Sequence, residues 1–268
     1  MKQNLGQYYD KTSSFQRAQF DALCDLMRDN IPLDKIHTIL DVGAGSGART
    51  LDLMSLFRQI EKIDAIEPDP EMLSVAKGEY NHPKVSYHQA KAEECAPIIE
   101  GIEKPIDMVF ANWSLHWVQD KDAFLEALNQ KLNASSFFAF STCEKLPDIL
   151  TDMDEYVRAE LLLPSLTEAP WYYLTADEWR ILLAKHGWRV MEQRSYETPH
   201  FAPDSRSYLE HWFSASTAKF LYGHQMEQIS DLSINDMLWF VEQKYADPDN
   251  EGGLRFIEDV TFCVAQRG

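Results

Sequence analysis

The first half of the chain alternates between short apolar runs and longer amphipathic stretches. Apolar residues rich in β-branched types predict strands at residues 36–42, 60–66, 85–88, 106–111 and 136–142. Between these runs the apolar residues recur at helical spacing, in stretches that begin after Gly47, at Pro70 and near Asp120. Residues 12–30 show the same spacing ahead of the first strand. Strands that alternate with helices in this way predict a doubly wound parallel sheet with helices on both faces.

The pattern changes after residue 142. An aromatic-rich region of helix and loop covers residues 145–175, and Thr175-Ala-Asp-Glu is a capping box that opens a helix. The remaining segments predict a sixth strand at 188–196, two helices within 204–246 and a closing strand at 256–264.

We therefore expect an α/β fold in which residues 1–268 form a single domain around a doubly wound, seven-stranded, mostly parallel sheet. Residues 1–32 are expected to form a lid helix. Residues 144–175 and 200–250 are expected to be insertions that cover a substrate at the ligand edge of the sheet.

The charge balance narrows the choice of partner. The chain has 268 residues, of which 45% are hydrophobic and 25% charged, a balance typical of globular proteins. Its net charge of −18 opposes binding to phosphate backbones and anionic membrane surfaces. We therefore expect a small-molecule substrate, neutral or cationic, and neither nucleic acid nor membrane as a partner.

Four cysteines lie far apart and form no Cys-x-x-Cys pair, which predicts reduced thiols: Cys24, Cys95, Cys143 and Cys263. The N-terminus lacks the apolar core of a signal peptide, and no apolar run reaches the roughly 20 residues of a membrane span. These features predict a cytoplasmic protein without a bound metal. A monomer is the favoured oligomeric state.

A glycine loop carries the main chemical signal. Gly43-Ala-Gly-Ser-Gly47 follows the first predicted strand and opens a helix, so the backbone can approach a ligand closely. The spacing G-x-G-x-G differs from the G-x-G-x-x-G of dinucleotide dehydrogenases. Glu67 ends the second predicted strand, where an acid can accept hydrogen bonds from both ribose hydroxyls of a nucleoside.

This combination resembles the class I S-adenosylmethionine (SAM) methyltransferases. Four stretches carry the resemblance in order and at the right spacing: residues 39–47, 65–70, 87–93 and 109–118. The resemblance implies SAM as the cofactor and assigns it these binding residues: Tyr9, Asp41, Gly43, Ala44, Gly45, Gly47, Glu67, Pro68, Ala92, Glu93 and Asn112. Many relatives carry Asp where this chain has Lys91. The side chain that usually contacts the adenine amine in those relatives is therefore absent here.

Within the superfamily, the chain resembles the histamine N-methyltransferases from Tyr8 to Val264. Members of that group hold a small amine in an aromatic-walled pocket. The resemblance implies that seven residues here bind the substrate: Phe15, Trp113, Trp117, Trp171, Tyr172, Trp212 and Phe213. Phe15 stands where that enzyme uses a carboxylate, and Trp113 where it has a polar side chain. The implied substrate is therefore an amine more apolar than histamine.

The resemblance also matches Glu258, on the closing strand, to a substrate-facing polar residue. Because an amine must lose a proton to present its lone pair, His116 and Glu258 are the expected catalytic residues. Two alternatives remain open. Asn112 and Trp117 match the Asn-x-x-x-x-Trp pattern of trans-aconitate and malonyl-carrier carboxyl O-methyltransferases. Such acids call for arginine, and the segments assigned to the pocket offer few, with Arg158 and Arg206 as the main candidates. The other alternative is a SAM-binding protein that no longer methylates.

Overall fold

The computed structural model describes residues 13–156, 158–159, 171–208 and 231–268. Its centre is a seven-stranded sheet in the order β3-β2-β1-β4-β5-β7-β6. The strands are β1 (Thr38–Val42), β2 (Lys62–Ile66), β3 (Val85–His88), β4 (Ile106–Asn112), β5 (Leu132–Cys143), β6 (Trp188–Ala202) and β7 (Leu254–Arg267). Strands β1 to β5 pair in parallel, and β7 pairs antiparallel with both β5 and β6. The predicted seven-stranded, mostly parallel sheet is confirmed.

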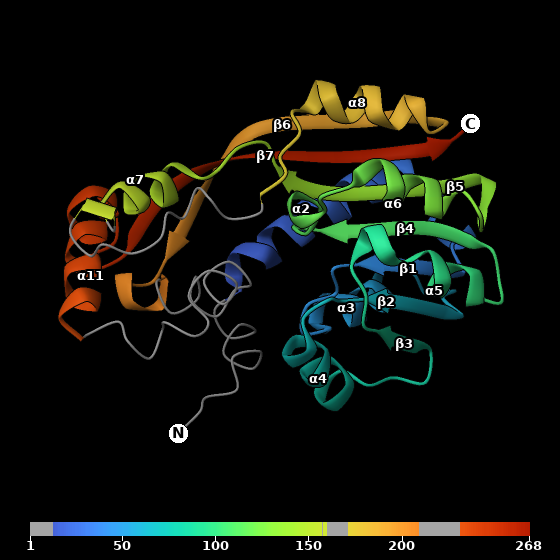
Figure 1. Cartoon of the computed structure of the whole chain (residues 1–268), viewed down its shortest axis with the longest axis horizontal. Coiled ribbons are helices and arrows are strands. Elements are labelled where there is room, and N and C mark those ends of the chain that lie inside the picture. The colour runs from blue at the N-terminus through green and yellow to red at the C-terminus, as the bar shows by residue number, and fades with distance from the viewer. Residues whose placement is uncertain (1–12, 157, 160–170, 209–230) are drawn as a thin grey trace.

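Helices cover both faces of this sheet (Figure 1). On one face α2 (Ser14–Asn30) and α3 (Ala48–Leu56) share an apolar core with alternate residues of the central strands, among them Ile39. On the other face α5 (Ala96–Gly101), α6 (Lys121–Leu128) and α8 (Ala176–Lys185) pack on the residues between, among them Leu40. The helix α4 (Pro70–Glu79) lies beside β3, at the edge of the sheet opposite β6.

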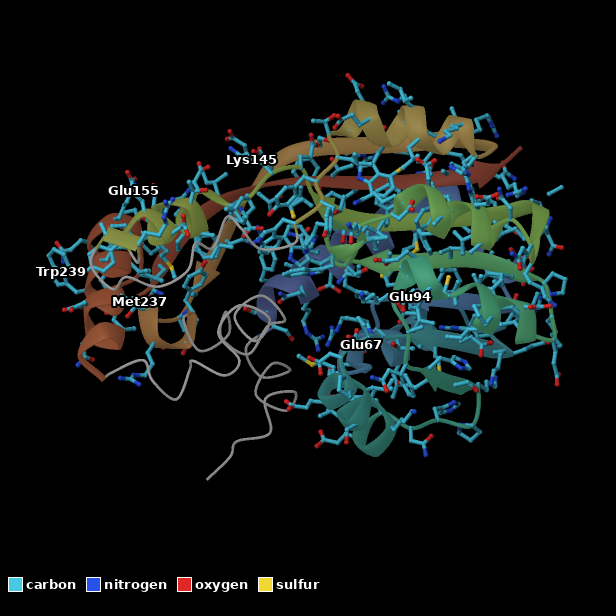
Figure 2. The ribbon with its side chains drawn as sticks, in the orientation of Figure 1. Glu67, Glu94, Lys145, Glu155, Met237 and Trp239 are labelled. Atoms are coloured by element: carbon cyan, nitrogen blue, oxygen red, sulfur yellow. The ribbon has the colours of Figure 1, made fainter. Side chains whose placement is uncertain are left out.

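The last two strands run beyond the central sheet as a long antiparallel pair (Figure 1). The helices α7 (Asp148–Tyr156) and α11 (Asp231–Tyr245) pack on this extension in a third apolar cluster. Figure 2 shows Met237 and Trp239 on α11, far from Glu67 in the central sheet. Met237 belongs to the cluster, whereas the Trp239 side chain is largely exposed.

Several element bounds differ from those predicted. The first two strands begin two residues later than predicted, after a short 3₁₀ helix at residues 33–35 and a turn at residues 58–59. The fifth strand begins at Leu132, earlier than the predicted residue 136, since α6 ends at Leu128. The sixth strand continues to Ala202 through Pro199. A proline is tolerated there because β6 is an edge strand, with no partner on its outer side.

The described part of the chain contains no helix long and apolar enough to cross a membrane. The four cysteines are all buried and unpaired with one another, as predicted. The covering role of 1–32, 144–175 and 200–250 stays a prediction. Residues 1–12, 160–170 and 209–230 of these segments lie outside the described residues.

Candidate active site

The glycine loop joins the end of β1 to α3. Gly43, Gly45 and Gly47 all have positive φ angles, of 77°, 57° and 90°, a conformation that side chains disfavour. A Cβ on Gly43 would lie 2.3 Å from the Ser114 side chain, and one on Gly47 would lie 2.6 Å from the Tyr87 hydroxyl. A Cβ on Gly45 would meet nothing within 4 Å. The first and last glycines are therefore required by protein packing, and Gly45 borders open space.

Glu67 ties this loop to the end of β2. Its Oε2 accepts a hydrogen bond from the Gly45 backbone N–H and its Oε1 one from the Asp69 N–H, both at 2.9 Å. Burial raises the pKa of Glu67 to about 7, and the two backbone N–H groups oppose that rise. Each carboxylate oxygen has a second lone pair, so the group can still accept hydrogen bonds from a diol.

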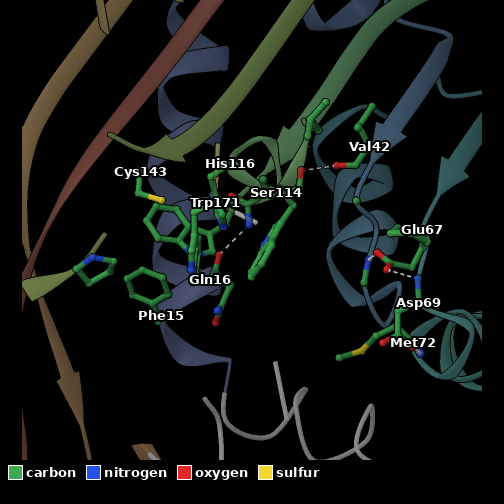
Figure 3. A pocket seen from close by; sticks show the side chains of 18 of the residues that line it. Phe15, Gln16, Val42, Glu67, Asp69, Met72, Ser114, His116, Cys143 and Trp171 are labelled. Atoms are coloured by element: carbon green, nitrogen blue, oxygen red, sulfur yellow. Dashed lines mark hydrogen bonds between the residues drawn. The ribbon is translucent and has the colours of Figure 1, made fainter. Parts of the chain in front are cut away.

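A single cavity of about 900 Å³ connects the glycine loop to the β6–β7 extension. Figure 3 shows Glu67, Asp69 and Met72 on one side of it and Phe15, Cys143 and Trp171 on the other. The nucleoside side is lined by Gly43, Gly45, Ile66, Glu67, Pro68, Asp69, Met72, Ala90, Lys91, Ala92 and Glu93. The middle is lined by Asn112, Trp113, Ser114, His116 and Trp117. The far side holds Phe15, Cys143, Trp171, Tyr172, Tyr208, Phe256 and Glu258, with smaller neighbours.

The nucleoside side fits the SAM expected there. The uncrowded Gly45 lets a ligand lie on the backbone, and Glu67 lies beside it with lone pairs for a ribose. Asn112 ends β4 facing this loop. Its side-chain amide donates to the Gln16 carbonyl on α2, and its oxygen accepts from Ser141. These bonds tie α2 to the carboxyl end of β4, where Asn112 borders the cavity.

Aromatic rings form the wall of the far side. Trp117 stacks on Trp171 with 4.3 Å between ring centroids, and Trp171 stacks on Tyr173 at 5.7 Å. Trp113 contacts the Phe15 ring edge-to-face at 4.8 Å. Trp113 has a φ of 58°, the single non-glycine residue with positive φ in the described part of the chain. Such strain is typical of functional sites, and here it directs an indole into the cavity wall.

Buried polar atoms interrupt this apolar wall. Within the described residues, Glu258 Oε2, His116 Nδ1 and Trp171 Nε1 are buried without a hydrogen-bond partner. Burial, with a smaller contribution from Asp259, raises the pKa of Glu258 to about 8. Burial and the charge of Lys121 lower the pKa of His116 to about 3, so its imidazole is neutral. Unpaired groups of this kind point to a polar ligand or to water in the cavity.

Lys121 connects two segments of the aromatic wall through hydrogen bonds to their backbone carbonyls. Its ammonium donates to the carbonyls of Val118 and Tyr172, at 2.7 and 2.5 Å. The Tyr172 N–H in turn donates to the His116 carbonyl at 2.8 Å. The segment that carries Trp171 is thereby fixed to the loop after β4. Burial lowers the pKa of Lys121 to about 8, a change that Glu93 and Cys143 oppose.

Most of the predicted site residues come together. Phe15, Trp113, Trp117, Trp171 and Tyr172 all line the cavity, as do both expected catalytic residues and most of the cofactor residues. Asp41 and Ala44 instead line a small adjoining void, and Gly47 lines neither space, since it packs against Tyr87. Tyr8, Tyr9, Trp212 and Phe213 lie outside the described residues.

The cavity also contains residues that the sequence did not indicate. Gln16, Cys143, Tyr208 and Phe256 line it. Phe256 and Glu258 share a face of β7, and this period of two was the available signal for Phe256. Neither Arg158 nor Arg206 is among the lining residues. The largely exposed Arg158 instead lies 4.0 Å from the buried Asp154. No cluster of three metal-binding side chains occurs among the described residues.

Comparison with known proteins shows which proteins this chain resembles. Residues 40–140 match the model of a family described as "Methyltransferase domain". A malonyl-[acyl-carrier protein] O-methyltransferase from Brevibacillus brevis is 26% identical over 96% of this chain and 91% of its own. A trans-aconitate 2-methyltransferase from Azoarcus sp. is 29% identical over 41% of this chain and 40% of its own. The chain spans between 44% and 64% of the length of three further malonyl-[acyl-carrier protein] O-methyltransferases.

Solved structures share the fold at low sequence identity. The YcgJ protein from Bacillus subtilis superposes with a TM-score of 0.56 at 14% identity, over 92% of this chain and 98% of that one. A phosphoethanolamine N-methyltransferase from Haemonchus contortus, solved with S-adenosylhomocysteine, gives 0.53 at 14% identity, over 92% and 52%. The matched family model, the sheet order and the open glycine loop beside Glu67 agree with one another. Residues 40–140 of this chain therefore match a methyltransferase domain, and this match together with the shared fold supports S-adenosylmethionine as the cofactor.

Proposed function

We propose that this protein transfers a methyl group from SAM to the nitrogen of a small amine. The observation that carries the proposal is Glu258, a buried carboxyl group with an unpaired oxygen in an aromatic-walled cavity. A buried carboxylate requires a partner, and an ammonium group supplies both the charge and the hydrogen-bond donors. The surrounding indole and phenol rings attract a cation by about 0.5–2 kcal/mol per good contact.

The charges along the cavity support the same substrate class. Lys91, on the nucleoside side, is the one cationic side chain among the described lining residues. A carboxylate substrate on the far side would face Glu258 without an arginine to bind it. The resemblance of the sequence to histamine N-methyltransferases supports an amine as well.

The chain's own residues would have to bind the amine, remove its proton and exclude water. When bound, SAM supplies a sulfonium methyl group that an amine lone pair can take in one displacement. Glu258, with a pKa of about 8, is better matched to accept a proton from an ammonium ion than His116, with a pKa of about 3. His116 is then a neutral hydrogen-bonding group. The stacked Trp117 and Trp171 exclude water and align the acceptor, an effect potentially worth about 7–11 kcal/mol.

A carboxyl O-methyltransferase is the second candidate. The relatives named for malonyl-carrier protein and trans-aconitate favour it, and the Asn112-x-x-x-x-Trp117 pattern agrees with them. In that case the substrate is an acid, free or attached to a carrier protein. It would bind with Glu258 protonated, as the raised pKa of that carboxyl group permits near neutral pH.

A paired screen distinguishes the two candidates. Small aromatic and aliphatic amines, small dicarboxylic acids and a malonyl-carrier protein are incubated with SAM, and S-adenosylhomocysteine release and product mass are followed. We expect methylated amines, and we expect Glu258→Gln to abolish their formation while it preserves S-adenosylhomocysteine binding. If methyl esters were the only products, the proposal that the substrate is an amine would be wrong. Turnover of no compound, with intact cofactor binding, would favour a protein that binds SAM without transferring its methyl group.

A further inference from the structure

A small void adjoins the main cavity at the glycine loop. It has a volume of about 40 Å³, and both spaces are lined by Gln16, Gly43, Gly45 and Asn112. A cofactor whose ribose lies at Glu67 and whose methyl group faces Trp113 still has an amino-acid group to place. The void lies next to both loop and strand end, so it is the space available for that group.

Acidic side chains near the glycine loop would repel the carboxylate of the cofactor. Asp41 lines the void itself, and Glu67, just after β2, accepts a hydrogen bond from the Gly45 N–H of the loop. Both are buried acids, which favour the sulfonium and the ammonium group of SAM but oppose its carboxylate. Arg49 is the one cationic side chain among the described residues that line the void.

Arg49 is held in place at this position. It is the second residue of α3, and its side chain is 17% exposed. Its guanidinium carbon lies 5.7 Å from the Phe20 ring centroid, and Nη1 lies 2.8 Å from Asp52 Oδ2. The Asp52 contact lacks hydrogen-bond geometry, so the buried Nη1 has no hydrogen-bond acceptor in the described part of the protein. A fixed guanidinium with an unused donor is suited to a carboxylate.

We propose that Arg49 binds the α-carboxylate of the cofactor in this void, with the α-amino group toward Asp41. The arginine then makes the site selective for adenosine ligands that carry the whole amino-acid tail. The inference rests on SAM as the cofactor and is independent of whether the methyl acceptor is an amine or an acid.

Two ligands that differ in the tail test this role by equilibrium binding. S-adenosylhomocysteine has the amino acid, and 5′-methylthioadenosine lacks it. Calorimetry on Arg49→Met should show S-adenosylhomocysteine binding weakened about 10- to 100-fold, because a charge-assisted contact is lost. Methylthioadenosine binding should stay within about twofold of the wild-type value on the same reasoning. Arg49→Lys should lie between, since lysine keeps the charge and loses the planar fork.

The matched control is Arg58→Met, which removes an exposed arginine just beyond the end of α3. It should bind both ligands as the wild type does. Unchanged S-adenosylhomocysteine affinity in Arg49→Met would overturn the proposal. An equal loss for both ligands would also overturn it, because it would show a general disturbance of α3. If the wild type bound neither ligand, the cofactor itself would be wrong, which is a different result from a failed amine screen.

Discussion

The ammonium of Lys121 donates a hydrogen bond to the backbone carbonyl of Tyr172, 51 residues further along the chain. This bond and the one to the Val118 carbonyl satisfy two acceptors behind the aromatic wall. Lys121 also lies 5.9 Å from the ring centroids of both Tyr172 and Trp179. A single buried cation thus connects the start of α6 to the segment that carries the cavity-lining rings of Trp171 and Tyr172.

We expect Lys121→Met to destabilise the protein by about 1–3 kcal/mol, because methionine keeps the packing volume but leaves buried carbonyls without a donor. Urea denaturation measures the change. The control is Lys185→Met, which removes an exposed lysine paired with exposed Asp122 and should cost about 0–1 kcal/mol. Equal effects of the two substitutions would contradict the structural role of Lys121.

Glu67 links cofactor affinity to pH. Its pKa of about 7 means that the carboxyl group is partly protonated near neutrality, whereas a ribose that donates two hydrogen bonds favours the ionised form. S-adenosylhomocysteine affinity should therefore fall as the pH is lowered through 7. Glu67→Gln should weaken binding by about 1.5–3 kcal/mol and should reduce this pH dependence. Titration calorimetry at several pH values makes the measurement, and an unchanged affinity in the variant would remove Glu67 from the site.

Substitutions at Gly45 and Gly43 should affect different properties: the first mainly cofactor binding and the second mainly thermal stability. Gly45→Ala places a methyl group in open space at a φ of 57°, so the fold should lose only about 1–2 kcal/mol while cofactor binding is strongly impaired. Gly43→Ala forces a Cβ to within 2.3 Å of Ser114 and should lower the melting temperature much more. Thermal unfolding together with S-adenosylhomocysteine binding separates the two. Equal melting temperatures would contradict this division of roles.

The sequence predicted those parts of the site that are formed by residues close together in the chain. The loop from Gly43 to Gly47, Glu67 at a strand end and the Trp113–Trp117 segment each depend on a short stretch of sequence. Contacts between distant segments were not predictable in this way. Arg49 and Lys121 have ordinary places on amphipathic helices, and their roles depend on a void beside Asp41 and on the Tyr172 carbonyl.

The bounds of some helices and strands were likewise not predictable from local sequence. Alternation of strands and helices predicted the sheet, but it placed the end of the sixth strand at Tyr196 and did not show the helix Ala96–Gly101. That helix has six residues, too few for a helical period to be visible. The extension of β6 depends on pairing with β7, which continues as far as Ala202 opposite Leu254. Pairing with a distant strand therefore sets the end of β6, and the local sequence does not show it.

Glu258 should also make the stability of the ligand-free protein depend on pH. Its pKa is about 8 in the folded state against an ordinary value of 4.5, so the folded protein keeps a proton that the unfolded chain has released. The stability that this group contributes is complete below pH 4.5 and is lost as the pH rises through 8. Glutamine has no proton to lose. We therefore expect the melting temperature of the wild type to fall more steeply than that of Glu258→Gln over this range.

The other buried titratable groups leave this comparison intact. Asp41 and Glu67, with pKa values raised by burial to about 7, act in the same direction in both proteins. His116 and His200, whose pKa values burial lowers to about 3, destabilise the fold as the pH falls below 6.5, again in both. The difference between the two melting curves thus isolates Glu258. An exposed control, Glu197→Gln on β6, should keep the wild-type slope. If Glu258→Gln kept that slope as well, Glu258 would be ionised in the empty cavity, and the cavity would not need a cation to hold its charge.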